Sequence, residues 1–111
     1  MHVGSALFYI GVSAMTDIEI DKALALAIGW ERQHFMPNTD AIFVLQYGMW
    51  HFFSHRDWNV IGPIAEKYNC FPLRLRGGAW EAISRGKYKL GFVKADTPQK
   101  AIALAVIGAL K

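Results

Sequence analysis

Residues 71–110 read FPLRLRGGAWEAISRGKYKLGFVKADTPQKAIALAVIGAL, and this stretch decides the fold. In its first part apolar residues alternate with polar or basic ones, which is the period of a β-strand. The predicted strands are Phe71–Arg76, Ala79–Ser84 and Lys87–Lys94, with Gly77-Gly78 and Arg85-Gly86 as the turns between them. Asp96-Thr97-Pro98 then predicts a helix start. The helix from Pro98 to Leu110 is apolar nearly all round, which is typical of a helix that is deeply buried or shared with a partner.

The N-terminal part of the chain predicts one helix after an apolar leader. Thr16 and Glu19 have the spacing of a capping box, and apolar residues then recur at helical spacing, so we expect a helix over 17–28. Residues 1–14 are apolar and lack the positive charge of a secretory signal. They are either an extra β-strand or an extension ahead of a natural start at Met15, and we favour the extension.

The middle of the chain predicts more strands and a short helix. Segments 41–46 and 49–53 are aromatic and β-branched with Gly48 between them, which predicts a hairpin or one bent strand. Proline is disfavoured inside a helix, so we expect Gly62-Pro63 to open a helix that runs to about Tyr68. We therefore predict an α+β domain over residues 15–111. It has an antiparallel sheet of about four or five strands and three helices, layered as an αβα-type sandwich.

Composition narrows the class of protein. A length of 111 residues allows one domain, and 53% hydrophobic with 19% charged residues excludes disorder. No apolar run approaches the roughly 18 residues of a membrane-spanning helix, so we expect no membrane partner. The single cysteine, Cys70, excludes an internal disulfide framework and a cysteine-rich zinc site. A reducing compartment is the simplest environment for such a chain.

Basic residues gather in the C-terminal part. Residues 1–70 carry four Lys/Arg against seven acids, whereas residues 71–111 carry eight against two. On the predicted strands these charges alternate with apolar residues and would project from one face. If the strands pair, they form a cationic patch made of Arg74, Arg76, Trp80, Arg85, Lys87 and Lys89. Such a patch can bind an acidic protein surface, or phosphates and a stacked base. It can also be a solvated face or a protected sheet edge.

No other set of residues predicts a reaction. His51 and His55 are four apart, but on a strand this spacing exceeds about 12 Å, so we interpret them as surface or edge histidines rather than metal ligands. Cys70 lacks a catalytic signature and is expected to be buried. Asp57 is expected to be a cap or turn former. The sequence therefore predicts a protein that is not an enzyme and has no cofactor.

Four segments in order resemble the phage αβα-sandwich domain family, the NinX-like proteins of bacteriophages and prophages. They are Met15–Ala23 with Leu26–Trp30, Asp57–Asn59 with Gly62–Glu66, Trp80–Ala82, and Ala95–Pro98 with Ala101-Ile102 and Ala105. Members of that family typically begin at the methionine of the first segment, which supports a start at Met15. The resemblance carries no known catalytic residue. It implies a phage-encoded accessory protein in the host cytoplasm.

From this setting, size and charge we expect a non-enzymatic binding protein. One task it would suit is inhibition of a host defence system, in the manner of anti-CRISPR proteins. The alternative is a nucleic-acid-binding protein of phage replication or recombination. The apolar C-terminal helix also predicts a possible homodimer.

Overall fold

The structure is a computed structural model that describes residues 15–30, 33–35, 42–86 and 90–110. The helices are α2 (Asp17–Ala27), α3 (Trp58–Lys67) and α4 (Pro98–Leu110). The strands are β1 (Gln33–Phe35), β2 (Ile42–Gln46), β3 (Met49–Phe53), β4 (Leu73–Arg74), β5 (Trp80–Arg85) and β6 (Leu90–Ala95). The predicted α+β class is confirmed, with three helices in the described part of the chain. The predicted leader, residues 1–14, lies outside the described residues.

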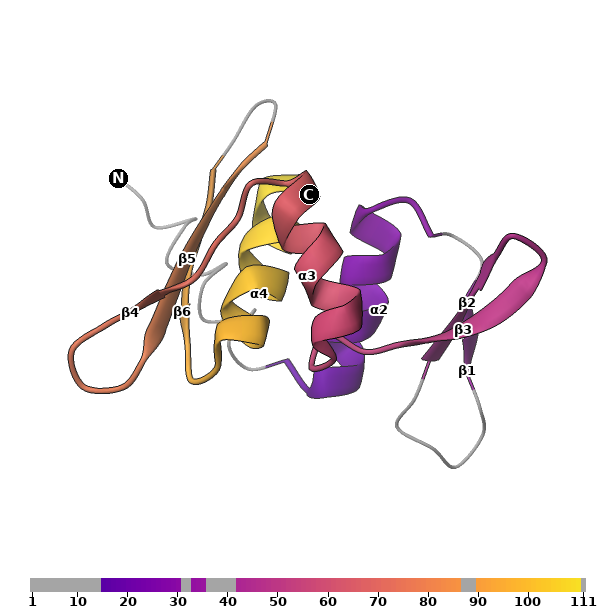
Figure 1. Cartoon of the computed structure of the whole chain (residues 1–111), viewed down its shortest axis with the longest axis horizontal. Coiled ribbons are helices and arrows are strands. Elements are labelled where there is room, and N and C mark those ends of the chain that lie inside the picture. The colour runs from indigo at the N-terminus through magenta and orange to yellow at the C-terminus, as the bar shows by residue number, and fades with distance from the viewer. Residues whose placement is uncertain (1–14, 31–32, 36–41, 87–89, 111) are drawn as a thin grey trace.

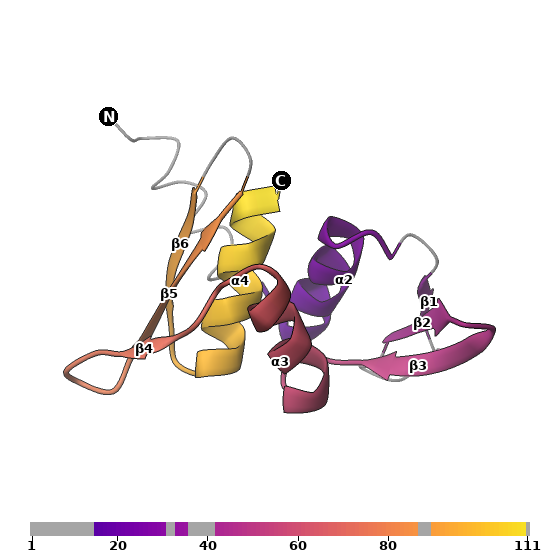
Figure 2. The same ribbon diagram turned by 45° about the horizontal axis from the view of Figure 1, so that its top comes forward.

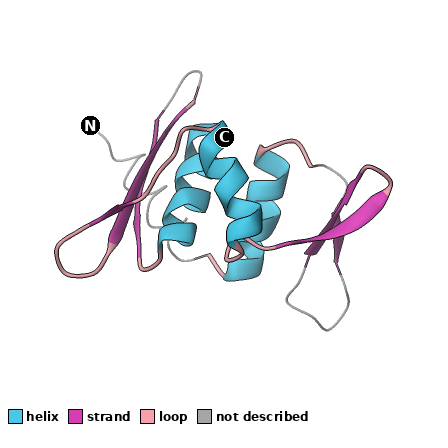
Figure 3. Cartoon of the chain, in the orientation of Figure 1, coloured by secondary structure: helices cyan, strands magenta, loops and turns pink. Residues whose placement is uncertain are grey.

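The strands form two antiparallel sheets instead of the single sheet expected. Sheet A has the order β1-β2-β3, and sheet B has the order β4-β5-β6. Figures 1 and 3 show the three helices between the two sheets, so the helical layer is the centre of the sandwich. Figure 2 shows the same order from a second direction. The helices are therefore covered by sheets, which reverses the expected arrangement of a sheet covered by helices.

Helix α4 explains this layer order. Every residue from Ala101 to Ala109 is buried, and α4 contacts β5 and β6 on one side and α2 and α3 on another. A helix that is apolar all round must be covered all round, which one sheet cannot do. This burial also overturns the predicted dimer through the C-terminal helix, because Leu104 and Ile107 are already enclosed within one chain.

Strand β6 approaches α4 so closely that only glycine fits at position 91. A β-carbon there would collide with the carbonyl oxygen of Ala105 and lie 2.8 Å from the backbone nitrogen of Ala109. The neighbouring helix-facing positions are Ala82 and Val93, both buried. Small residues thus form the inner side of sheet B, because the backbone of α4 occupies the space that larger side chains would need.

Helix α3 corrects the prediction for Pro63. The helix begins after Asp57, whose Oδ1 accepts a hydrogen bond from the Asn59 backbone N–H at 2.9 Å. Asp57 is therefore a cap, as predicted, but Pro63 lies inside the helix and not at its start. The residue before a proline is normally kept out of the α conformation by its β-carbon, and Gly62 has none. The Gly-Pro pair allows the helix to continue.

Strands β2 and β3 form a hairpin, which is one of the two arrangements that the sequence predicts for this segment; the other, one bent strand, is not formed. Gln46 pairs with Met49 across a two-residue turn in which Tyr47 and Gly48 have φ angles of 51° and 78°. Two positive φ values are those of a type I′ turn, whose twist matches that of the flanking strands. In Figure 1 this turn lies at the end of sheet A that points away from the helices.

Candidate interaction surface

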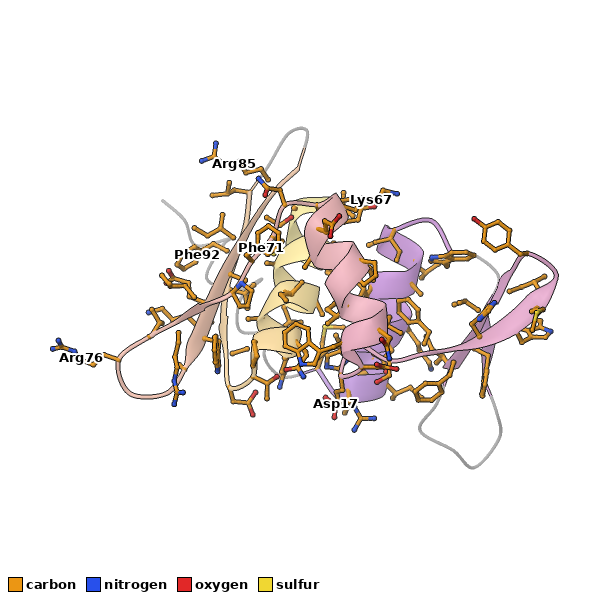
Figure 4. All side chains as sticks on the ribbon, viewed as in Figure 1. Asp17, Lys67, Phe71, Arg76, Arg85 and Phe92 are labelled. Carbon is orange, nitrogen blue, oxygen red and sulfur yellow. The ribbon has the colours of Figure 1, made fainter. Side chains whose placement is uncertain are left out.

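Sheet B places the predicted basic residues differently from the expected patch. Strand β5 lies between β4 and β6, so these two strands do not pair with each other. Arg74 is opposite Trp80 in the register, and its guanidinium lies 5.8 Å from the centroid of that ring. Figure 4 shows Arg76 and Arg85 at opposite ends of the sheet. Lys87 and Lys89 lie outside the described residues.

Four large apolar side chains are exposed on the side of sheet B that faces away from α4. Ile83 is opposite Phe92 in the register, and Leu90 is opposite Arg85. The apolar residues and their exposed fractions are Leu73 62%, Ile83 41%, Leu90 55% and Phe92 47%. Figure 4 shows Phe92 on the outward side. We call this surface, with Glu81, Arg85 and Lys94, the outer face of sheet B.

The alternation of apolar and polar residues in the sequence suggests that the large apolar side chains of sheet B point into the core, but in the structure they point outward. Leu73, Leu90 and Phe92 have the pattern of a buried side, but they face outward. The buried positions of β5 and β6 are occupied by Ala82, Ser84, Gly91 and Val93. Bulky residues normally mark the core side of a strand, and only the close approach of α4 prevents it here. Gly91 within a predicted strand was the signal that could have revealed this approach.

The described residues also contain a buried histidine–carboxylate pair that sequence reasoning missed. His55 and Asp21 are each about 1% exposed. Asp21 Oδ1 accepts hydrogen bonds from the His55 backbone N–H at 2.7 Å and from its ring Nδ1 at 2.6 Å. The predicted surface position of His55 is therefore wrong, whereas His51 is exposed as expected. The pair joins α2 to the segment that leads into α3.

This pair is not arranged for catalysis. The second ring nitrogen of His55, Nε2, faces Asp17 Oδ1 at 3.6 Å, so carboxylate groups face both nitrogens. A general base needs a nitrogen directed at a nucleophile or at bound substrate, and it needs access. His55 has neither. The arrangement stabilises the junction between two helices.

Cys70 is buried, as predicted, and it is not activated. Burial is the main cause that raises the pKa of its thiol to about 11, and the neighbouring Ser84 hydroxyl lowers this pKa by a smaller amount. The thiolate is the reactive form, so Cys70 stays a protonated and unreactive thiol at neutral pH. The Ser84 hydroxyl itself reaches hydrogen-bond geometry with no described residue.

A cavity of about 700 Å³ lies between sheet A and the helices. Val44, Phe53 and Ile64 form apolar parts of its wall, and His51 and Lys67 are polar residues of the lining. Within the described ranges, no three histidine, cysteine or carboxylate side chains are grouped to hold a metal ion. No described helix is long and apolar enough to cross a membrane.

Comparison with known proteins finds no matching family model and no similar curated protein.

Proposed function

We propose that this chain is a non-enzymatic binding protein that engages an acidic protein surface through the outer face of sheet B. The observation that carries the proposal is the row of exposed apolar side chains on a strand-supported face, with Arg85 and Lys94 beside them. Exposed apolar patches with a polar rim are typical of protein interaction sites. Phe92 is the candidate anchor at the centre, since aromatic residues dominate the energetics of interfaces.

The same geometry favours a protein partner over nucleic acid. Nucleic-acid surfaces combine basic residues along the backbone path with aromatic rings that stack bases. Among the described residues of the outer face, Leu73, Ile83 and Leu90 are aliphatic and Phe92 alone offers a ring. Arg74 lies over the ring of Trp80 on the other side of the sheet. Aliphatic side chains suit an apolar protein surface, and the basic rim selects an acidic one.

The biological setting is part of the proposal. Resemblance to the phage αβα-sandwich family supports a phage-encoded accessory protein that acts in the host cytoplasm. There the partner would be a protein complex of host defence, which the chain would inhibit by covering its acidic surface.

The test is capture of partners from bacterial host lysate, with and without nuclease, by wild type, Phe92→Ser and Arg85→Glu. Leu26→Ser is the matched control, because Leu26 is an exposed apolar residue of α2 with 58% of its surface accessible. We expect a protein that survives nuclease treatment, is retained by the control and is lost by both sheet B variants. Equal capture by wild type and Phe92→Ser would contradict this surface.

The nucleic-acid alternative has its own readout in a titration with labelled DNA at two salt concentrations. Binding through phosphates would give a log–log salt slope of about −0.7 per contact on single strands. A capture that nuclease abolishes, together with such a slope, would replace the acidic protein by nucleic acid as the partner.

A further inference from the structure

Sheet A carries a second exposed apolar surface, on the opposite side of the helical layer from sheet B (Figure 1). In the β2–β3 register Phe43 is opposite Phe52 and Leu45 is opposite Trp50, so these four side chains share the side that faces away from the buried Ile42 and Phe53. The rings of Phe43 and Phe52 meet edge to face, with centroids 5.9 Å apart. Tyr47, in the turn that follows β2, lies at the hairpin end of this surface and is 94% exposed. We call Phe43, Leu45, Tyr47, Trp50 and Phe52 the aromatic surface of sheet A.

The aromatic surface of sheet A differs from the outer face of sheet B in its charge. Residues 42–53 contain no aspartate, glutamate, lysine or arginine. The outer face of sheet B, in contrast, carries Arg85, Lys94 and Glu81. In a two-fold symmetric dimer the same patch meets itself, so a charged group near the two-fold axis is brought close to its own copy. An uncharged surface has no such penalty and therefore fits a second copy of this chain.

The amount of exposed apolar surface is that of a weak dimer. The exposed fractions are Tyr47 94%, Trp50 51% and Phe52 48%. Aromatic side chains bury roughly 150–250 Å² each when fully covered. These fractions therefore supply about 400 Å² per copy, or about 800 Å² in all, to which the half-buried Phe43 and Leu45 add, and this is the size of weak, reversible interfaces. Tyrosine, tryptophan and phenylalanine are also residues that interfaces enrich.

We propose that the chain forms a symmetric homodimer in which the aromatic surface of sheet A packs against the same surface of a second copy. The interface leaves the outer face of sheet B uncovered, because the two sheets lie on opposite sides of the helices. The dimer is thus independent of the proposed partner binding, and either can fail without the other.

Sedimentation velocity at chain concentrations of about 1 to 100 μM tests the dimer directly. We expect wild type to shift from the mass of one chain to twice that mass across this range. The double variant Trp50→Thr/Phe52→Thr keeps strand-forming residues on β3, and its dissociation constant should rise at least tenfold. A wild type that stays monomeric throughout, or a double variant that dimerises as wild type does, overturns the proposal.

Two further variants make the result independent of folding defects. Phe92→Thr is the matched control, since Phe92 and Phe52 are exposed to nearly the same degree, 47% and 48%, on different sheets. Phe92→Thr should dimerise as wild type does. If this variant were monomeric instead, the interface would lie on sheet B. Tyr47→Asn removes an aromatic ring, and asparagine suits a turn position with positive φ. If circular dichroism shows the double variant unfolded, unchanged dimerisation of a folded Tyr47→Asn overturns the proposal.

Discussion

At the residue scale, the carboxylate of Asp21 illustrates how a buried polar group is made tolerable. Burying an isolated carboxylate costs several kcal/mol, and the penalty is offset only when its oxygens receive hydrogen bonds. His55 supplies two donors to the same oxygen, one from the backbone and one from the ring. Arg56, next in the chain, reaches Asp17 Oδ2 at 3.5 Å nearer the surface. His55 and Arg56 therefore both bind carboxylates in the N-terminal half of α2.

Substituting Asp21→Asn should lower the free energy of unfolding by about 3 kcal/mol, because a neutral amide oxygen accepts the two His55 hydrogen bonds more weakly than a carboxylate does and the new NH₂ group is buried without a partner. Urea unfolding followed by circular dichroism measures the loss. Asp17→Asn is the control, since Asp17 is half exposed and an exposed ion pair contributes about 0–1 kcal/mol. Equal losses in both variants would show that burial of the pair is not what stabilises the junction.

Sequence reasoning could not find this pair, because its members are 34 positions apart. Asp21 has an ordinary local explanation, a negative charge in the N-terminal half of a helix. His55 follows an aromatic strand in the exposed-looking run Ser54-His55-Arg56-Asp57. Neither residue carries a local signal of burial. Contacts between distant residues arise from tertiary packing, which periodicity and spacing do not encode.

At the scale of elements, the starts of α2 and α4 are the features that local sequence predicts best, whereas the start of α3 lies four residues before the predicted Gly62. Thr16 and Glu19 form the expected capping box, with the Thr16 backbone N–H donating to Glu19 Oε1 at 2.9 Å. Thr97 Oγ1 accepts from the Lys100 backbone N–H at 3.2 Å, which caps α4 as expected. Caps depend on residues three positions apart, so a single sequence contains the whole interaction.

Glu19 makes the first of these caps sensitive to pH. Hydrogen bonds from the backbone and side chain of Thr16 lower the pKa of the Glu19 carboxyl below its ordinary value. A lowered folded-state pKa stabilises the protein above the unfolded-state pKa, and this contribution is lost as the pH falls through the folded-state value. The melting temperature of Glu19→Gln should therefore be below that of wild type at neutral pH, and the difference should shrink on acidification. A difference that is constant from about pH 7 to about pH 3 would contradict a charged cap.

The arrangement of the strands into sheets was not predictable by the same means. The residue pattern indicates every strand of the two sheets except β1, and the hairpin of β2 and β3 has its own turn signal in Gly48. The close approach of β6 to α4 at Gly91 joins residues that are distant in the chain, and neither periodicity nor spacing encodes such a contact. The predicted cationic patch depends on the condition that the basic strands pair. In the fold β5 separates β4 from β6, and the described residues Arg74, Arg76 and Arg85 lie at different ends and sides of sheet B.

At the scale of the whole molecule, the central helical layer separates two surfaces of different chemistry (Figures 1 and 2). The outer face of sheet B combines apolar residues with a basic rim, and the aromatic surface of sheet A carries no charged residue. A dimer through sheet A would hold two copies of the sheet B face on its outside. Two linked binding faces raise the apparent affinity for a partner that presents several sites.

The two surfaces should respond to salt in opposite directions. The chain carries a formal net charge of +3, so two copies repel each other at long range, and added salt screens this repulsion. The dimer constant should therefore stay the same or tighten when sodium chloride rises from about 50 mM to about 500 mM, because no opposite charges hold the aromatic surface of sheet A together. Binding of an acidic partner by Arg85 and Lys94 should weaken over the same range, because its attraction is screened. Sedimentation velocity at both salt concentrations measures the first response, and capture at both concentrations measures the second. A dimer that dissociates in high salt would mean that ion pairs from another surface hold the two copies together.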